Sequence, residues 1–438
     1  MYALRGDSKP QTMAEKYFAS RYGVPMINRP EDLPQTGTVL WSIHSFRDAY
    51  KVAAMSHLKG DAEWVTGGNA ATNPTGVAWI MDRIFLGDAW AEFGQILAGD
   101  RSHPSLYNPS DPGPVPLNEE PIPDHPVAPG VVMMSVGCPR RCLFCVNAFR
   151  RPYEEQDQQV ILDYVRGSAR KGIDLISNSS SDVSYYEDIT RTLADAGKTD
   201  TGISMAMAAT SDEVIAARKR EMLWGIEGMS QRMRKLMNKP IKRALLRERL
   251  IRALQLGKQV RTVYQFNFPT ETVEDWEEFL GDVEHVREAC DSGYWAIPFI
   301  PHQPTAMTPT QWLRPQYSLD MVERIMAFRK SMFGSKENGV GVYVPAPLYP
   351  RGWFQQVLSE WLPITPALAA AAQALPHKAP IPELVSRMDD AGFDVSHIFD
   401  SDKPKDYAFP WDHIQPWMDR DRLWHFAKRL RKGGAVAG

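Results

Sequence analysis

The chain has 438 residues, of which 43% are hydrophobic and 24% charged, an ordinary composition for a globular protein of two or three domains. No apolar run approaches the roughly 18 residues of a membrane span. The first residues, MYALRGD, lack the apolar core of a signal peptide, so we expect a cytoplasmic protein without membrane association. A formal net charge of −3 excludes a general attraction to nucleic acid, which would need a local basic patch.

The first hundred residues alternate short apolar runs with helical patterns. Residues 39–43 and 63–66 are predicted as buried strands, and residues 46–58 and 90–97 as helices. This β-α-β-α order indicates a small open parallel sheet of Rossmann or flavodoxin type over residues 1–102. Nine prolines between positions 104 and 129 exclude helix and central strand, so residues 103–129 are predicted to form a stiff linker.

From residue 130 the chain alternates six predicted strands with helices. The strands are expected at residues 131–136, 173–177, 202–206, 221–226, 260–268 and 295–300. Such repeats indicate an α/β fold, a partial (β/α)6 barrel over residues 130–335, with its working site at the carboxyl ends of the strands. Beyond residue 335 the pattern weakens into Pro- and Trp-rich sequence, so residues 336–438 are predicted to form a C-terminal accessory region.

Three cysteines follow the first predicted barrel strand. Cys138, Cys142 and Cys145 lie in the run GCPRRCLFC, and three thiolates on one short loop can bind three irons of a [4Fe–4S] cluster. A closed zinc site, the alternative, needs four ligands. The remaining cysteine, Cys290, ends an apolar helix and is predicted to be buried, and the loop contains no histidine. The odd local count and the missing signal peptide argue against disulfides.

The spacing CxxxCxxC, with an aromatic residue before the last cysteine, resembles the signature of the radical S-adenosylmethionine (SAM) enzymes. The resemblance implies that the iron without a cysteine binds the amino and carboxylate groups of SAM. It also implies reductive cleavage of SAM to a 5′-deoxyadenosyl radical that abstracts hydrogen from a carbon atom. A reductant such as flavodoxin or ferredoxin would supply the electron.

Four further segments resemble the methylthiotransferase-like and cobalamin-associated radical SAM enzymes. They are GIEGMSQRMRKLMNK (225–239), FNFPTETVED (266–275), GGNAATNP (67–74) and LGDAWAEF (86–93). No cysteine precedes Cys138, so the second cluster of the methylthiotransferases is missing and sulfur insertion is not expected. His44 and His57 lack the DxHxxG context of a cobalamin ligand, but some relatives bind cobalamin without one, so this cofactor stays open for the N-terminal domain.

The resemblance also suggests residues that bind the cofactors. Phe144 would pack beside the cluster, and Asn178, Ser179 and Ser180 would contact the SAM amino group. Ser204, Glu227 and Arg232 would contact its ribose, methionine moiety or carboxylate. Each has a structural alternative: core packing for Phe144, a turn for the Asn/Ser run, and a solvent-exposed helical position for Arg232. Glu271 and His302 follow later strands and are candidate substrate contacts.

Nine basic residues and a single acid occupy positions 232–252. Lys242, Arg243, Arg247 and Arg249 are predicted on one side of a helix that buries leucines on the other. Such a stripe suits a phosphate backbone, although an exposed face without a partner is an equal alternative.

These residues and the resemblance suggest three alternative functions. The first is a radical SAM enzyme that isomerises or rearranges a nucleobase in DNA or RNA, which would have to be flipped out of a duplex. The second is a cobalamin-dependent radical SAM methyltransferase that acts on a peptide or small natural product. The third is a zinc-binding scaffold without catalysis.

Overall fold

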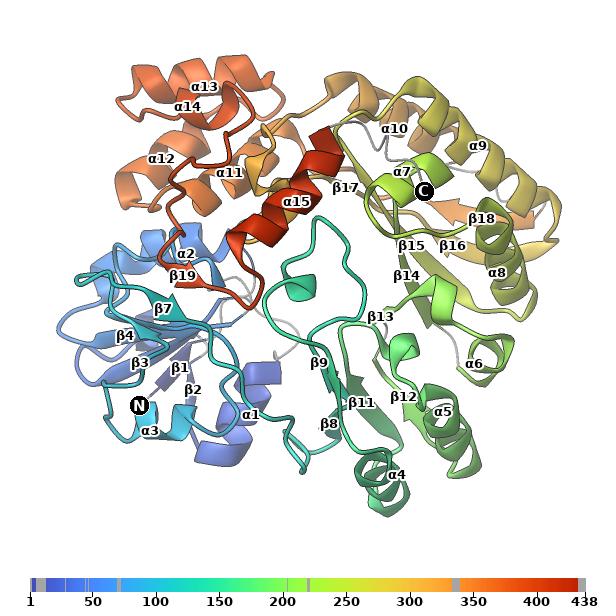
Figure 1. The fold of residues 1–438 in the computed structure, drawn as a ribbon, viewed down its shortest axis with the longest axis horizontal. Coiled ribbons are helices and arrows are strands. Elements are labelled where there is room, and N and C mark those ends of the chain that lie inside the picture. The colour runs from blue at the N-terminus through green and yellow to red at the C-terminus, as the bar shows by residue number, and fades with distance from the viewer. Residues whose placement is uncertain are drawn as a thin grey trace.

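The computed structural model describes residues 2–4, 13–27, 29–43, 45, 47–68, 72–202, 204–218, 221–332 and 339–431. The chain folds into an N-terminal parallel sheet, a central row of strands covered by helices, and a C-terminal helical region above both (Figure 1). Within the described residues, no helix combines the length and apolar character needed to cross a bilayer.

The N-terminal sheet has the strand order β2-β1-β3-β4-β5-β6. All neighbours are parallel except β5 and β6. The strands are β1 (Tyr2–Leu4), β2 (Met26–Ile27), β3 (Thr38–Ser42), β4 (Glu63–Gly67), β5 (Arg83–Phe85) and β6 (Leu106–Tyr107). The helices are α1 (Met13–Tyr22), α2 (Arg47–Met55) and α3 (Phe93–Leu97). The open parallel sheet expected from the sequence is therefore present.

The proline-rich segment is held in place by strand pairing near its start and in its middle. Its first strand, β6, completes the N-terminal sheet. Its second strand, β7 (Val115–Pro116), pairs with β19 (Ile414–Gln415) near the C-terminus. Prolines restrict these strands to two residues each, because every proline removes a backbone donor from a ladder. The segment thus joins the first and last parts of the chain.

The central strands run parallel in sequence order and form an open, partial barrel. One sheet has the order β12-β11-β8, and the other has the order β13-β14-β15-β16-β18, with β17 also paired to β15. The strands are β8 (Val131–Met133), β11 (Gly172–Ile176), β12 (Thr199–Asp200), β13 (Ser204–Met205), β14 (Glu221–Glu227), β15 (Gln259–Phe266), β16 (Ser292–Ala296), β17 (Phe299–Pro301) and β18 (Gly339–Tyr343).

Two predicted strands are interrupted. The first is divided into β8 and β9 (Ser135–Val136), and the sixth into β16 and β17 on either side of Pro298, which cannot donate a ladder hydrogen bond. The third is shortened to β13, and β12, which precedes it, was not predicted. β18 extends the sheet beyond residue 335, where the sequence pattern placed the end of the barrel.

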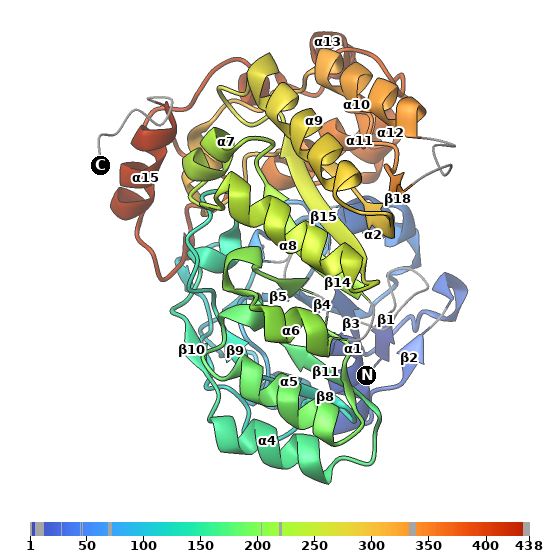
Figure 2. The same ribbon diagram turned by 90° about the vertical axis from the view of Figure 1, so that its right-hand side faces the viewer.

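Helices cover one face of these strands. Figure 2 shows α4, α5, α6, α8 and α9 in a row in front of the sheet. They are α4 (Gln158–Gly167), α5 (Tyr186–Asp195), α6 (Asp212–Ala217), α8 (Arg243–Gln255) and α9 (Val273–Glu288), with α10 (Leu319–Met332) after them. Alternate strand residues such as Trp224, Tyr264 and Trp295 are buried against these helices in one core. Their neighbours point to the opposite, inner face.

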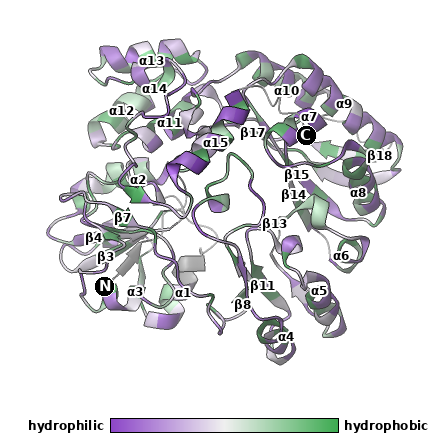
Figure 3. Ribbon diagram, in the orientation of Figure 1, coloured by the Kyte–Doolittle hydropathy of each residue, from purple (hydrophilic) through white to green (hydrophobic). Residues whose placement is uncertain are grey.

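A second core joins the three parts of the molecule. It contains Trp64 of the N-terminal sheet, Phe149 after the cysteines and Trp353 of the C-terminal region. The C-terminal helices are α11 (Pro350–Trp361), α12 (Pro366–Ala374), α13 (Ile381–Asp390), α14 (Ser396–Phe399) and α15 (Arg420–Arg431). Figure 3 shows α15 as largely hydrophilic, in contrast to the greener strands. Only its buried side, including Leu423 and Leu430, joins the core.

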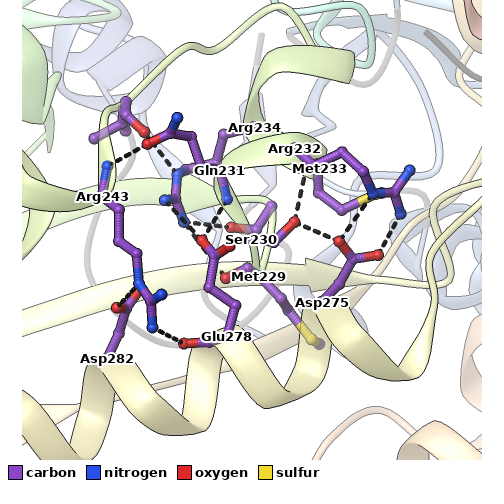
Figure 4. A network of polar contacts seen from close by, with 12 residues as sticks. Met229, Ser230, Gln231, Arg232, Met233, Arg234, Arg243, Asp275, Glu278 and Asp282 are labelled. Atoms are coloured by element: carbon purple, nitrogen blue, oxygen red, sulfur yellow. Dashed lines mark hydrogen bonds and ion pairs between the residues drawn. The ribbon is translucent and has the colours of Figure 1, made fainter. Parts of the chain in front are cut away.

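A polar network joins α7 (Gln231–Leu236) to α9 (Figure 4). The Asp275 carboxylate accepts hydrogen bonds from the Ser230 hydroxyl and the Arg232 guanidinium, and it also caps the first turn of α9. Arg234 is fully buried and donates from Nε to the carbonyl of Ile241 at 3.0 Å. Two of the segments singled out in the sequence, 225–239 and 266–275, therefore contact each other.

Candidate functional site: a three-cysteine loop at the ends of the barrel strands

The loop that carries the cysteines is closed at its base. It leaves β9 (Ser135–Val136) and returns through β10 (Glu154–Glu155), which pairs antiparallel with β9. Gly137 has a φ of 65°, and a β-carbon there would collide with the carbonyl oxygen of Pro152. Only glycine tolerates both the left-handed backbone and this close approach. The three cysteines thus lie on a loop with a fixed origin.

Apolar side chains fix the interior of the loop. Leu143 and Phe149 are almost fully buried in the core shared by all three parts, and Phe144 packs against that core while remaining partly exposed. The Leu143 amide donates to the carbonyl of Met237 at 3.1 Å. Phe144 therefore packs against the core, which was the structural alternative for this residue, and it also lies directly before Cys145.

Polar side chains from the next strand hold the other side of the loop. The Asn178 amide donates to the carbonyl of Gly137 at 2.6 Å, and its oxygen accepts from Asn147 at 2.9 Å. Arg140 forms a bidentate pair with Asp182, with both N–O distances 2.7 Å. Asn178 and Asp182 both follow β11, so the Asn/Ser-rich turn positions the cysteine loop.

The three thiols lie close enough to influence one another. Cys142 is buried, whereas Cys138 and Cys145 are partly accessible. Burial raises the pKa of all three, to about 12 for Cys142, while the nearby Lys239 ammonium opposes the shift for each. A zinc ion would need ligands that converge on one point. Among the described residues, no group of three His, Cys, Asp or Glu side chains does so. A cluster instead takes each thiolate on a different iron.

Cys290 lies apart from this loop. It is 4% exposed in the core between strands and helices, where its Sγ faces the carbonyl of Ile251 at 3.9 Å. The sequence-based prediction of a buried core cysteine is confirmed.

A row of polar side chains crosses the strand ends beside the thiols. Lys239 Nζ donates to Glu227 Oε1 at 3.0 Å, and Gln265 Nε2 donates to Glu227 Oε2 at 2.8 Å. His302 Nδ1 lies 3.3 Å from Gln265 Oε1. The row therefore runs from the cysteine loop across the ends of β14, β15 and β17.

Backbone geometry makes room for this row. Glu227 has a φ of 71°, an unfavourable value for a residue with a side chain, at an irregularity in the pairing of β14 with β15. A β-carbon on Gly225 would collide with both Glu227 Oε1 and Lys239 Nζ. Burial lowers the pKa of Lys239, but Glu227 and the neighbouring thiols outweigh it and leave the pKa above its ordinary value.

The row also fixes the tautomer of His302. Gln265 directs its NH2 group toward the Glu227 carboxylate, so its oxygen faces His302 and must accept from Nδ1–H. Burial lowers the pKa of His302 to about 3, so the ring is neutral. Nε2 then carries a lone pair, and it is buried without a hydrogen-bond partner. His302 therefore offers an unused acceptor at the strand ends.

The remaining predicted cofactor residues divide into two groups. Ser179 and Ser180 are buried in the turn after β11, and the Ser179 hydroxyl donates to Asp182 at 2.6 Å. The side chain of Ser204 lies outside the described residues, and its backbone belongs to β13. Arg232 directs its guanidinium to Asp275 and to the carbonyl of Thr270, at 2.7 Å for the latter. Arg232 is therefore not an unpaired arginine on the helix surface, and its guanidinium does not contact the cysteine site.

Glu271 lies on the outer rim rather than in the polar row. Its Oε2 accepts from the Asn267 amide at 2.9 Å, and Oε1 has no partner. Burial raises its pKa to about 8. It lines a hollow of about 380 Å³ between the first turns of α9 and α10. Asn267 has a φ of 68°, a left-handed value that glycine adopts more readily than asparagine.

The basic stripe on α8 is occupied by acids of neighbouring helices. Arg243 and Arg247 both bind Asp282 of α9, at 2.6 and 2.7 Å, and Arg249 binds Asp212 of α6. Lys242 precedes the helix and is exposed. The sequence predicted these residues on one side of the helix, but Arg243 and Arg247 face α9 whereas Arg249 faces α6, and Figure 2 shows α8 between these two helices. These three arginines therefore do not form a patch of unpaired cations that could bind nucleic acid.

Several residues of the site were not singled out from the sequence. Lys239 and Gln265 belong to the polar row, and Asn238 donates to the carbonyl of Arg141 at 2.7 Å. The signal for Lys239 and Asn238 was present in the MNK ending of the segment 225–239. Gln265 is an inward-facing strand residue, and only its neighbours show its role.

Buried ion pairs join the site to the N-terminal sheet. Asp88, which follows β5, binds Arg151 and lies 3.6 Å from Arg150. Asp88 and Arg151 are 5% and 3% exposed in their side chains, so this contact is sealed from solvent. The carboxyl end of the N-terminal sheet therefore abuts the cysteine loop.

Comparisons with known proteins agree with this geometry. Residues 132–283 match the model of the Radical SAM superfamily. An uncharacterized protein of Methanocaldococcus jannaschii is 27% identical over 159 residues, which are 35% of this chain and 36% of that protein. The chain thus matches about a third of the length of that curated relative.

The solved structures found by structural comparison include three enzymes. OxsB, a cobalamin-dependent SAM radical enzyme with aqua-cobalamin and SAM bound, is 12% identical over 57% of this chain and 44% of its own, with a TM-score of 0.42. Methylornithine synthase (PylB) is 15% identical over 60% and 81%, with a TM-score of 0.34. Streptococcus suis SuiB bound to SAM is 13% identical over 49% and 50%, with a TM-score of 0.33.

We expect Gly137→Ala to prevent normal cluster loading. The added methyl group meets the Pro152 carbonyl and the residue keeps a left-handed φ, so the loop base must open at a cost of about 2 kcal/mol or more. Iron and sulfide content after anaerobic reconstitution measures the effect. Gly167→Ala, at the end of α4 with no atom within 4 Å of the added carbon, is the control. Equal iron content in both variants would contradict the closed-base explanation.

The double variant Arg243→Ala with Arg247→Ala should lower the free energy of unfolding by about 3 kcal/mol, because it leaves the buried Asp282 charge unpaired. Urea unfolding measures this loss. The exposed control Lys242→Ala should stay within about 0.5 kcal/mol of the original chain. If the double variant instead keeps its stability and loses affinity for DNA or RNA, the stripe binds nucleic acid.

Proposed function

We propose that this chain, whose residues 132–283 match the Radical SAM superfamily, cleaves SAM reductively and uses the resulting radical to abstract hydrogen from a carbon atom of its substrate. The observation that carries this proposal is the closed three-cysteine loop, held at the strand ends beside the Lys239–Glu227 pair.

The residues of the loop fit a [4Fe–4S] cluster. Cys138, Cys142 and Cys145 are free thiols on one loop, and the fourth cysteine of the chain is remote. Their pKa values are raised by burial, so binding of iron must displace the protons. The chemistry that such a cluster supplies is transfer of one electron to the sulfonium of SAM, whose C–S bond breaks to give methionine and a 5′-deoxyadenosyl radical.

The polar row suits the zwitterionic end of SAM. Lys239 offers an ammonium for the carboxylate, and Glu227 offers a carboxylate for the amino group. Both are largely buried, which strengthens each interaction relative to one in water. Lys239 takes the role that the sequence gave to Arg232, because Arg232 is bound to Asp275.

His302 suits a substrate contact. Its neutral Nε2 accepts a hydrogen bond and its orientation is fixed through Gln265. A hydroxyl or amino group of the substrate would satisfy this buried acceptor, whose burial without a partner is otherwise unfavourable. The His302 ring also packs on Phe268, with centroids 4.6 Å apart, which restricts its rotation.

Isomerisation or rearrangement of a nucleobase in DNA or RNA remains the first candidate for the outcome. Its support no longer includes the α8 arginines, which are paired. Exposed Lys428 and Arg429 of α15 remain as cations, because no ion pair of theirs is found among the described residues. The electron would come from a carrier of the flavodoxin or ferredoxin type.

A cobalamin-dependent methyltransferase is the second candidate, and one observation favours it. The carboxyl end of the N-terminal sheet, where open α/β sheets bind ligands, meets the cysteine loop through Asp88 and Arg151. His57 does not fit as a cobalt ligand, because it lies after α2, toward the amino end of β4. His44 lies outside the described residues. Any cobalamin would therefore have to bind without His57.

Replacing Cys138, Cys142 or Cys145 singly by Ser should abolish the cluster, since three ligands are the minimum set. The reconstituted chain should contain about four irons and four sulfides, show a cubane signal by electron paramagnetic resonance, and form 5′-deoxyadenosine with reductant. Cys290→Ala is the matched control and should retain all three properties. Turnover that survives a loop replacement, or a bound zinc ion with no iron, would overturn the proposal.

Lys239→Met should weaken SAM binding about tenfold, because it removes one charged hydrogen bond of roughly 1.5 kcal/mol. Equilibrium dialysis of the reconstituted protein with labelled SAM measures this without turnover. Lys235→Met removes an exposed lysine from the same segment and should leave the affinity unchanged. Equal affinities in the two variants would remove Lys239 from the SAM site.

A further inference from the structure

Exposed apolar side chains gather on one part of the central sheet. Among the described residues, the large hydrophobic side chains that remain exposed are Leu256, Val273, Leu280, Tyr294, Ile300, Tyr343 and Trp417. Tyr294, Ile300 and Tyr343 belong to the neighbouring strands β16, β17 and β18, with exposures of 44%, 50% and 51%. A grouped apolar patch indicates a binding surface, whereas single exposed residues are ordinary.

All three side chains lie on the inner face of the sheet. Trp295, Phe299 and Val342 are buried against the covering helices. Because strand residues alternate between faces, Tyr294, Ile300 and Tyr343 point to the opposite side. The β16–β18 register pairs Ala296 with Tyr343, and Tyr294 precedes Ala296 by two residues on the same face. The three residues form a wall on this inner face, which we call the inner wall.

The inner wall continues into the polar row beside the cysteines. Ile300 is the register partner of Gln265, which holds both Glu227 and His302. A molecule that lies along this wall therefore has one end at the strand ends. This is where the proposed radical chemistry takes place.

A cation lies beside the wall at the level of Tyr343, because Arg261 is the register partner of Ala296, and Ala296 is the partner of Tyr343. Arg261 is exposed on the same face of β15 as Gln265, and it forms no ion pair with the residues that the structure describes. With Leu223 and Tyr294 it lines a small hollow. Glu221 lines the same hollow but is not within ion-pair distance of Arg261. Gln265 lies four positions after Arg261, so the two are about 13 Å apart along the strand.

We propose that the inner wall binds the substrate, and that this substrate is an elongated anion with a planar ring. Its acid group pairs with Arg261, its ring packs on Tyr294 and Tyr343 near that level of the sheet, and its reacting end extends past Ile300 toward Gln265 and His302. The proposal rests on the function proposed above for its reacting end, while the wall itself is defined by contacts and exposure alone. A nucleotide and an aromatic carboxylic acid both have this chemistry.

The first experiment uses two fluorescent probes with the anaerobically reconstituted full chain. The probes are 1-anilinonaphthalene-8-sulfonate, which is anionic, and N-phenyl-1-naphthylamine, which is neutral. Ile300→Ser with Tyr343→Ser should raise the Kd of both probes about fivefold, because roughly 1 kcal/mol of apolar contact is lost. Arg261→Gln should raise the Kd of the anionic probe by a similar factor, flatten its salt dependence, and leave the neutral probe unaffected.

A matched control lies on the outer helices. Leu256→Ser with Leu280→Ser replaces two side chains that are 38% and 36% exposed on the other side of the sheet. It should not change the Kd of either probe. If this control weakens the probes as much as the wall variant does, or if Arg261→Gln affects both probes equally, the inner wall is not the site.

Competition identifies the source of the anion. Uridine 5′-monophosphate, which lacks the adenine of SAM, and indole-3-acetate are titrated against the bound anionic probe. Displacement by either one supports the wall and indicates a nucleotide or an aromatic acid, respectively. Displacement by neither overturns the proposed substrate class. A chain that forms no 5′-deoxyadenosine fails the proposed function, whereas the probe pattern is read by fluorescence and still decides the wall.

Discussion

The closed base of the cysteine loop is the constraint on which the site depends. A loop with three thiols can hold a cluster only if its ends and its interior are fixed, because the ligands must keep one geometry. The left-handed Gly137 against the Pro152 carbonyl fixes the ends, and Leu143 and Phe149 fix the interior. Asn178, after β11, and Asn238, after α7, then hold the loop from two different elements. The position of the thiols is therefore fixed by the contacts of their loop with the surrounding barrel.

Charged side chains in this protein serve two separate purposes. On the outer side, Arg232, Arg243 and Arg247 pair with aspartates of α9 and hold neighbouring helices together. At the strand ends, Lys239 and Glu227 form a buried pair beside the thiols, on a strained backbone with a glycine that makes room. Strain and buried charge together are typical of functional sites. The same basic-rich segment supplies both groups.

The two faces of the central strands explain where chemistry and stability reside. The outer face is apolar and buried beneath helices, as in Trp224, Tyr264 and Trp295. The inner face carries Arg261 nearer the start of β15 and Gln265 at its carboxyl end, where Gln265 lies beside Glu227 of β14, and exposed aromatic residues lie on β16 and β18. The ion pair between Asp88 and Arg151 joins the N-terminal sheet to the cysteine loop, so the carboxyl end of that sheet lies near the same site.

The sequence by itself determined the parallel α/β architecture, the buried Cys290, the loop that carries three cysteines, and the resemblance of residues 132–283 to the Radical SAM superfamily. These features are local: strand and helix periodicity, cysteine spacing and proline density are all set by nearby residues. The tertiary structure alone decided that Arg232 meets Asp275, that the α8 arginines face carboxylates, and that Lys239, Gln265 and His302 form one row. These charged side chains belong to strands and helices that are far apart in the chain. A local spacing pattern contains no information about which of these elements become neighbours in space.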